Sequence, residues 1–241
     1  MLLPHKLRIT MKKLCTLLLA ALFAVCPFGC TKQTTAMPHT AEPTETQTEN
    51  EREIFLTFDD GPSDSVTPLV LDVLHREGVH ATFFLIGRQV AGREQIVRRI
   101  AAEGHAIGIH SYSHVYEEIY ASPAALMRDI EHCIDAVRTA LPQFEARLYR
   151  FPGGSFSHGE DFKQTVKALG LRAYDWNAAT YDATSPPPSA EQQYNNAVQS
   201  AADRRHIVLL QHDCVRQQAT AECLPRIIAY YRERGYVFKT L

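Results

Sequence analysis

The sequence predicts an α/β fold, a distorted (β/α) barrel of about seven parallel strands in a single domain. Two observations predict it. From Ile54 onward, seven short apolar segments alternate with six helical patterns, and such alternation is typical of parallel β/α architecture. The alternating region covers residues 54–241, which is 188 residues, whereas a complete eight-fold barrel takes about 250 residues. An open, doubly wound sheet is the alternative architecture for the same pattern.

The chain begins with a segment that resembles an export signal. Two lysines after Met11 precede the apolar run 14–26, which has the length of a signal-peptide core and is too short for a typical membrane-spanning helix. Met11 is therefore a candidate for the true start. Cys30 follows Gly29 as in a bacterial lipoprotein cleavage site, although Pro27 and Phe28 depart from the usual residues. We expect residues 1–30 to be a signal peptide of the lipoprotein type with lipidation at Cys30, and plain secretion is the alternative.

Residues 31–53 are rich in Thr, Glu, Gln and Pro and hold almost nothing that could be buried. Such a segment cannot offset its ordering entropy, so we expect a disordered linker. The catalytic domain would then comprise residues 54–241. We expect an exported monomer at the outer face of the cell membrane or in the cell wall, with membrane attachment only through the lipid on Cys30.

The predicted strands are short, mostly apolar segments bounded by turn-forming or polar residues. In chain order they are residues 54–60, 81–87, 106–110, 147–153, 171–177, 206–213 and 236–241. The predicted helices between them are residues 66–78, 93–104, 123–141, 162–170, 189–202 and 224–235. Four of these helices end at glycines, Gly78, Gly104, Gly170 and Gly235, the residue expected just past a helix C-terminus.

The composition excludes several classes of protein. The chain is 45% hydrophobic and 22% charged, and 25 basic against 27 acidic residues give a formal net charge of −2. Because nucleic-acid binders normally carry a basic excess, we expect no nucleic-acid partner. The six cysteines include no Cys-x-x-Cys pair, which argues against a zinc knuckle or a thioredoxin-like site. Cys214 and Cys223 either form a disulfide or remain free thiols.

Polar side chains follow the predicted strands where these end. They are Asp59 and Asp60, His110, Arg150, and His212 with Asp213. In β/α barrels the strand C-termini meet at one rim, where the active site is built. His110 and His114 are spaced to present two imidazoles to one ion, and two His with one Asp make a complete catalytic metal site. Taken alone, Asp59-Asp60-Gly61-Pro62 is also compatible with a simple turn.

With these motifs in their order, the chain resembles the polysaccharide deacetylases of carbohydrate esterase family 4, which share the NodB homology domain. The resemblance runs from Ile54 to Leu241. It is carried by TFDDGP at 57–62, GVHATFFLIG at 78–87, EGHAIGIHSYSH at 103–114, YRFPGG at 149–154, DWNAATYDA at 175–183 and LLQHD at 209–213. It implies a distorted (β/α) barrel that hydrolyses N-acetyl, sometimes O-acetyl, groups on a glycan with the help of a metal ion.

The resemblance also implies roles for individual residues. Asp60, His110 and His114 would bind a divalent cation, with zinc expected and cobalt or another divalent ion as alternatives. Asp59 would be the general base that takes a proton from the attacking water, because an ion lowers the pKa of water toward neutrality and a nearby carboxylate completes the deprotonation. Arg150 would fix Asp59 by a charge-assisted hydrogen bond.

On the leaving-group side, His212 matches the general acid that protonates the amine, and Asp182 the carboxylate that orients this histidine. The backbone N–H of Gly153 matches the oxyanion donor. Leu210 would line a small pocket for the acetyl methyl group, or serve as an ordinary core leucine.

The sequence departs from the family's pattern at three positions. Gly153 stands where many members carry an aromatic residue, Ala183 where many carry Trp, and Val115 where Pro is frequent. The first two line the family's substrate groove, so they bear on substrate preference more than on the chemistry. We expect Trp176 to pack within its strand and not to bind sugar.

The expected function is metal-dependent removal of N-acetyl groups from a cell-envelope polysaccharide, with peptidoglycan N-acetylglucosamine as the expected substrate. One alternative is an O-acetyl esterase acting on acetylated xylan or sugars. Another is an inactive glycan-binding lipoprotein on the same scaffold. The sequence speaks against the inactive form, because the three ligands, the base, the acid and their two partners are all present.

Overall fold

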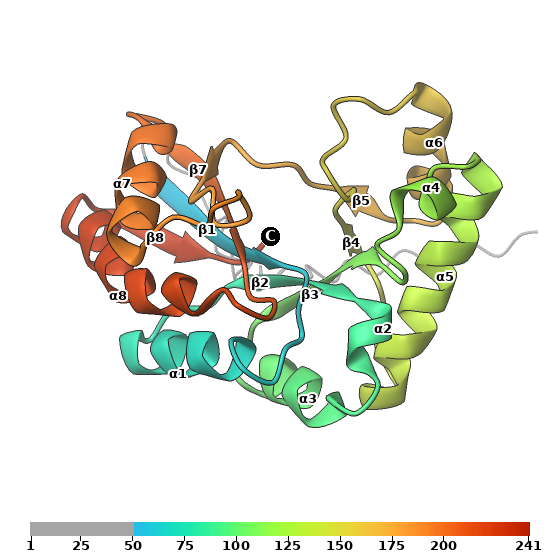
Figure 1. The fold of residues 1–241 in the computed structure, drawn as a ribbon, viewed down its shortest axis with the longest axis horizontal. Coiled ribbons are helices and arrows are strands. Elements are labelled where there is room, and N and C mark those ends of the chain that lie inside the picture. The colour runs from blue at the N-terminus through green and yellow to red at the C-terminus, as the bar shows by residue number, and fades with distance from the viewer. Residues whose placement is uncertain (1–50) are drawn as a thin grey trace, which may run out of the picture. The chain divides into compact units, whose positions relative to one another are not determined.

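The computed structural model describes residues 51–241 (Figure 1). The predicted signal peptide, the predicted lipidation site Cys30 and most of the predicted linker therefore lie outside the described residues. Within the described part, no helix is long and apolar enough to cross a membrane.

Eight strands form one sheet in which all the strand pairs are parallel. The strands are β1 Arg52–Asp59, β2 Thr82–Ile86, β3 Ala106–Ser111, β4 Leu148–Tyr149, β5 Arg172–Ala173, β6 Ala178–Ala179, β7 His206–His212 and β8 Tyr236–Lys239. Along the sheet they follow the order β5-β4-β3-β2-β1-β7-β6, and β8 pairs with β1 beside this path. β8 contacts the first half of β1 and β2 the second half. The sheet curls into a partial barrel, which confirms the predicted fold class.

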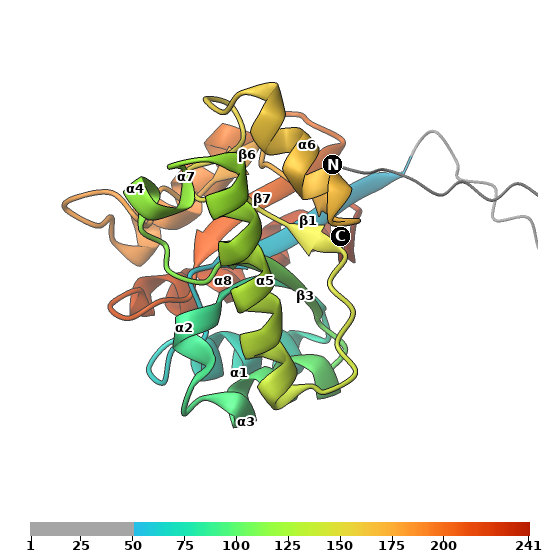
Figure 2. The ribbon, with the colours of Figure 1, turned by 90° about the vertical axis from the view of Figure 1, so that its right-hand side faces the viewer.

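Helices cover the outside of the curled sheet (Figures 1 and 2). They are α1 Thr67–Glu77, α2 Gly87–Val90, α3 Glu94–Ala102, α4 Tyr116–Ile119, α5 Pro123–Ala140, α6 Glu160–Ala168, α7 Ala190–Ala201 and α8 Gln218–Glu233. Capping residues explain where several of these helices begin or end. Ser122 caps α5 by accepting a hydrogen bond from the Ala125 N–H, Ser189 and Gln192 form a capping box at α7, and Gly78 ends α1 with a left-handed backbone.

Central strands and helix faces form one hydrophobic core. All five residues of β2 are buried, as are the last six of β1. Leu56, Phe83 and Leu209 from the strands pack with Leu74 of α1 and Ile227 of α8. Burying such side chains is worth about 1.5–3 kcal/mol each relative to exposure, which anchors the strand ends that carry the site.

The structure corrects some boundaries. The predicted strand 171–177 is replaced by β5 and β6, which lie at opposite ends of the sheet order. Backbone hydrogen bonds locate the crossing between these ends. The Tyr174 N–H donates to the Tyr149 carbonyl of β4, and three residues later the Asn177 N–H donates to the Val208 carbonyl of β7. Trp176 therefore lies in the crossing and not in a strand. The sheet remains open here because no strand pair joins β5 to β6.

Other differences concern element ends. β1 begins at Arg52, inside the range predicted as linker, because β8 provides it with a partner strand. α8 begins at Gln218, before the predicted residue 224, and the short helices α2 and α4 had no counterpart in the prediction. A helix of four residues makes only about one turn, so the sequence shows no repeated spacing of apolar residues that could predict it.

Candidate active site

The carboxyl ends of β1, β3, β4 and β7 bring the predicted polar side chains to one rim of the sheet. Asp59 is the last residue of β1, His110 lies near the end of β3, Arg150 follows β4 directly and His212 ends β7. The parallel register aligns Asp59 with His212. All parallel strands deliver their C-terminal residues to the same edge, which is why residues far apart in the chain meet here.

Three side chains converge as a possible metal site. Asp60 Oδ1 lies 3.4 Å from His110 Nε2 and 3.3 Å from His114 Nε2. One ligand atom from each residue lies within 4.8 Å of the others, and Asp60 Oδ1 is buried without a hydrogen-bond partner. A buried, unpartnered carboxylate oxygen facing two imidazole nitrogens is costly alone and fits a divalent cation.

The tautomer of His110 also fits metal binding. Its Nδ1 lies 2.9 Å from the Arg150 carbonyl oxygen, which can only accept a hydrogen bond. Nδ1 therefore carries the proton, and the lone pair on Nε2 faces Asp60. Such a carbonyl partner is the usual way in which proteins orient a metal-binding histidine.

Two of these residues adopt backbone conformations that are uncommon for residues with a side chain. Asp60 has φ 71° and His114 has φ 53°, in the left-handed region. At Asp60 the strand ends and the chain turns away, so that Asp59 and Asp60 can face different partners. Conformations of this kind often mark functional sites.

A residue that the sequence reasoning missed holds the loop with both histidines. Asp129 on α5 accepts three hydrogen bonds, from Ser111 Oγ at 2.7 Å, from the Tyr112 N–H at 2.9 Å and from the Ser113 N–H at 3.0 Å. Ser111 Oγ in turn accepts from the His114 N–H at 2.9 Å. The available signal was an acidic residue beside Leu126, Ile130 and Cys133 on the buried side of the helix.

Mutual charges shift the pKa values of the three residues. Burial would raise the pKa of Asp60, but the nearby imidazoles of His110, His212 and His114 outweigh this and lower it well below its usual range. Burial disfavours protonated His110, yet the charges of Asp59 and Asp60 outweigh this and raise its pKa. For His114, burial dominates and lowers the pKa. The cluster thus keeps an ionised carboxylate beside the imidazoles.

Arg150 holds Asp59 from inside the barrel. The arginine is fully buried, and its Nη1 donates to Asp59 Oδ1 and to Thr57 Oγ1, both at 2.8 Å. Its Nε donates to the Tyr174 carbonyl at 3.0 Å, and the guanidinium lies 4.2 Å from the Phe84 ring centroid. A buried arginine needs such a set of partners, so Asp59 is fixed in place. Its other oxygen, Oδ2, lies 3.9 Å from His110 Nε2.

Asp182 and His212 form the second acid–base pair of the rim. Asp182 Oδ1 lies 2.7 Å from His212 Nδ1, and Oδ2 accepts from the His212 N–H at 2.7 Å and from Thr220 Oγ1 at 2.9 Å. Burial opposes protonation of His212, but the hydrogen bond and charge of Asp182, with Asp59 and Asp60, raise its pKa to about 9. The histidine is therefore a proton donor at neutral pH. Thr220, like Thr57, was missed from sequence.

The remaining predicted residues lie beside this rim. Leu210 precedes His212 by two residues on β7, so both side chains share one face of the strand. Leu210 is buried but lies outside the main core cluster, unlike its neighbour Leu209. Gly153 follows β4 with φ 77° and is exposed. Asp213 belongs to neither acid–base pair: its buried carboxylate accepts from Thr67 Oγ1 at 2.5 Å.

Cys214 and Cys223 are free thiols, and so is Cys133. Cys223 Sγ donates to the Thr220 carbonyl at 3.3 Å from within α8. The possibility of a disulfide between Cys214 and Cys223 is thus not realised in the structure.

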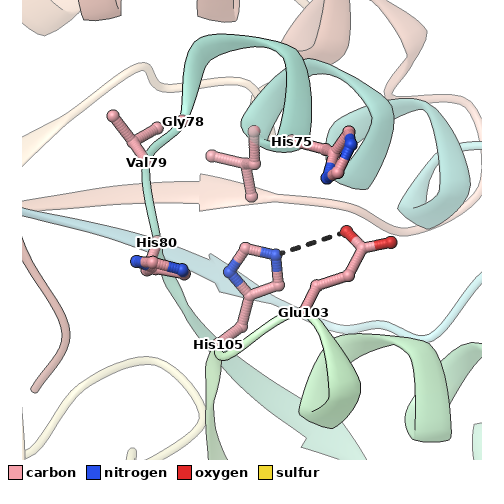
Figure 3. A pocket seen from close by; sticks show the side chains of 7 residues that line it. His75, Gly78, Val79, His80, Glu103 and His105 are labelled. Atoms are coloured by element: carbon pink, nitrogen blue, oxygen red, sulfur yellow. Dashed lines mark ion pairs between the residues drawn. The ribbon is translucent and has the colours of Figure 1, made fainter.

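A small pocket of about 110 Å³ lies at the opposite end of the strands, before β2 and β3 (Figure 3). His105 lies inside it, and its Nε2 faces Glu103 Oε2 at 3.8 Å. His105 Nδ1 accepts from the Ala81 N–H, so Nε2 carries the proton and offers no lone pair to a metal. Burial, with the charge of His80, lowers the pKa of His105 to about 4. Residues at this end of a barrel serve stability.

The chain is similar to known proteins over most of its length. Residues 46–174 match the family model described as "Polysaccharide deacetylase". A chitooligosaccharide deacetylase of Sinorhizobium fredii is 32% identical over 202 residues, which cover 78% of this chain and 89% of the relative. A peptidoglycan-N-acetylglucosamine deacetylase of Bacillus cereus is 32% identical, with 80% of this chain and 87% of the relative covered.

Among solved structures, a Streptococcus mutans CE4 esterase superposes with a TM-score of 0.75 at 36% identity. The match covers 80% of this chain and 87% of the esterase. The family match over residues 46–174 includes β1, β3 and β4, which carry Asp59, His110 and Arg150 at or just after their ends.

Proposed function

Because the chain belongs to the polysaccharide deacetylase family, we propose that it removes N-acetyl groups from peptidoglycan N-acetylglucosamine and releases acetate with the help of a divalent metal ion. That the chain is a deacetylase acting on an N-acetylated polysaccharide follows from the family. The single observation that supports a working catalyst is the meeting of the Asp60, His110 and His114 cluster with two buried, hydrogen-bonded acid–base pairs at one rim.

The possible metal site suits a divalent cation with nitrogen and oxygen ligands, and zinc is the ion proposed. Asp60 Oδ1, His110 Nε2 and His114 Nε2 would hold it. A cation bound there would supply Lewis acidity, which polarises a carbonyl group and makes a nearby water more acidic. Three protein ligands leave room for water and substrate, as in other catalytic sites.

Asp59 acts as the general base in this proposal. Oδ1 is occupied by the hydrogen bond from Arg150 Nη1, so Oδ2 is the oxygen that receives the proton of the attacking water. Attack on the acetyl carbonyl produces a tetrahedral centre with a negative oxygen. The Gly153 N–H is the proposed donor to that oxygen, and Leu210 would contact the acetyl methyl group.

His212 acts as the general acid. An amine is a poor leaving group, so its nitrogen must receive a proton before the carbon–nitrogen bond breaks. Asp182 accepts from Nδ1 and thereby leaves Nε2 to carry and donate the proton. A pKa of about 9 keeps His212 protonated at neutral pH.

The choice of peptidoglycan rests on the predicted N-terminal segments and on the Bacillus cereus relative. Lipidation at Cys30 and a linker of 21 residues, 31–51, which ends where β1 begins, would tether the domain within about 23–27 Å of the outer membrane face on average. That distance keeps the domain near cell-wall glycan. A second candidate is O-acetyl ester hydrolysis, which the similarity to a CE4 esterase favours.

An acetate-release assay on isolated cell walls, N-acetylglucosamine oligomers and acetylxylan, each with and without chelator, tests the proposal. We expect chelator-sensitive release from the first two. Activity confined to acetylxylan would support the esterase, and no release from any substrate would support an inactive binding protein.

Cell fractionation of wild type and Cys30→Ser tests the anchor. Only wild type should sediment with membranes, and protein free in the medium would contradict lipidation.

A further inference from the structure

Gly153 and Gly154, which follow Pro152, lie next to aromatic side chains from other parts of the chain. A Cβ on Gly153 would lie 3.1 Å from the hydroxyl of Tyr116, and a Cβ on Gly154 would lie 2.8 Å from the Phe156 ring and 3.1 Å from Trp176. Both glycines have positive φ values. Aromatic groups from other positions therefore occupy the space beside Gly153 and Gly154, where a side chain would otherwise project.

Phe156 and Trp176 form an aromatic pair beside these glycines. Their ring centroids lie 5.8 Å apart and the rings are nearly perpendicular, at 89°. Trp176 is half-buried, whereas Phe156 is 71% exposed. Among the described residues, Phe156 is the most exposed large apolar side chain, and its position beside a second aromatic ring makes the pair a candidate binding surface. This arrangement reverses the expectation that Trp176 packs within a strand.

The pair is held in place by hydrogen bonds between its neighbours. The Ser155 N–H donates to Asp175 Oδ1 at 2.8 Å, and Ser155 Oγ donates to Asp175 Oδ2. Ser155 precedes Phe156 and Asp175 precedes Trp176, so these two bonds tie the two loops together. The exposed ring thus belongs to a built surface, and binding a ligand there costs little ordering entropy.

The surface is continuous with the candidate active site. Gly153, the proposed oxyanion donor, is next to Gly154, which contacts both rings. The Arg150 guanidinium, which holds Asp59, lies 5.8 Å from the Trp176 ring centroid. A polymer whose acetyl group reaches Gly153 would therefore carry its neighbouring unit toward Phe156 and Trp176.

We propose that Phe156 and Trp176 form a carbohydrate subsite that binds the sugar ring adjacent to the one that loses its acetyl group. A pyranose ring presents C–H groups on its face, and the negative face of an aromatic ring attracts such polarised hydrogens. This proposal rests on the proposed function, because the subsite would bind a sugar of the same polysaccharide that does not itself react. Binding energy from such a remote unit raises kcat/KM for polymers.

The first test compares Phe156→Ala with wild type on an N-acetylglucosamine tetramer and on 4-nitrophenyl acetate, which has no neighbouring sugar. We expect kcat/KM for the tetramer to fall about tenfold and that for the small ester to change less than twofold. Tyr230→Ala is the matched control, because Tyr230 and Tyr194 form a similar pair, 6.0 Å apart at 84°, between α7 and α8. Equal losses on both substrates, or none on the tetramer, would overturn the subsite.

A second test reads binding without turnover. Trp176 is the only tryptophan in the chain, so its fluorescence reports on this surface. In the Asp59→Asn background, we expect the tetramer to shift the emission with a Kd that Phe156→Ala weakens about tenfold. An unchanged emission overturns the subsite even if the wild-type protein releases acetate. A shift that Phe156→Ala weakens supports the subsite, and if the wild-type protein then releases no acetate from any substrate, only the proposed function is contradicted.

Discussion

The carboxylate of Asp182 holds His212 at two points, with Oδ1 2.7 Å from Nδ1 and Oδ2 2.7 Å from the backbone N–H of the same residue. One acidic side chain thus fixes both the ring and the end of β7. Thr220 completes this arrangement through its hydrogen bond to Oδ2. Because Asp182 contacts both the ring and the backbone of His212, the orientation and the pKa of the histidine depend on the same carboxylate. Substitution of Asp182 tests this dependence.

Asp182→Asn should lower kcat on an N-acetylated glycan by about 10²–10⁴-fold, because the amide neither charges His212 nor enforces its tautomer. His212→Ala should have a similar effect. Both variants should keep their metal, since neither residue belongs to the cluster of Asp60, His110 and His114. Steady-state kinetics with elemental analysis checks this, and near-normal turnover in either variant would refute the acid assignment.

The pH profile should follow His212. Its raised pKa, about 9, means that the proton donor is present below that pH and is lost as the pH rises through it. The rate on N-acetylglucosamine oligomers should therefore fall above about pH 9. His212→Gln cannot titrate, so its residual rate should lack this alkaline limb. A limb that persists unchanged in this variant would assign it to another group.

Removal of a predicted ligand should remove metal and activity together. Asp60→Ala and His110→Ala each leave two of three protein ligands, which cannot hold the ion with normal affinity. Metal content after dialysis, measured by elemental analysis, should fall with kcat. Asp59→Asn is the control, because it should lose turnover and retain metal. Full occupancy in both ligand variants would show that the ion binds elsewhere.

Asp129→Ala should weaken metal binding although Asp129 is no ligand. Its three hydrogen bonds hold the loop between His110 and His114, and loss of such supporting contacts typically costs about 10–100-fold in metal affinity. Competition with a chelator of known affinity measures the change. The neighbouring Arg128, which is exposed on the same helix, provides the control variant Arg128→Ala. Equal affinities in both variants would contradict a positioning role for Asp129.

His105 should make the fold sensitive to acid. Burial, with the charge of His80, lowers its folded pKa to about 4, from 6.5, so the unfolded chain takes up the proton first as the pH falls. Stability is then lost between pH 6.5 and 4, by about 3 kcal/mol in full. His105→Asn retains an acceptor for the Ala81 N–H and does not titrate, so denaturation at pH 4.5 and 7 should show a smaller difference. His75→Asn, in the same pocket, should behave like wild type.

The sequence by itself predicted the fold class, because parallel β/α architecture leaves a local record in alternating apolar segments and helical patterns. It also predicted that Asp59, His110, Arg150 and His212 would meet, since parallel strands deliver their ends to one edge. The motifs that resemble the family assigned the same residues to the site. The fold class and the meeting of these side chains could be predicted because each depends on local periodicity or on one rule of topology.

Only the tertiary structure decided which groups support that site. Asp129 on α5 contacts Ser111, 18 positions away in the chain, and Thr220 on α8 contacts Asp182, 38 positions away, and no local pattern encodes such contacts. The division of residues 171–177 between two ends of the sheet was equally hidden, because both halves read as one apolar segment. Trp176 consequently lies beside Phe156 instead of within a strand. Side-chain partners over long distances depend on packing, which periodicity does not record.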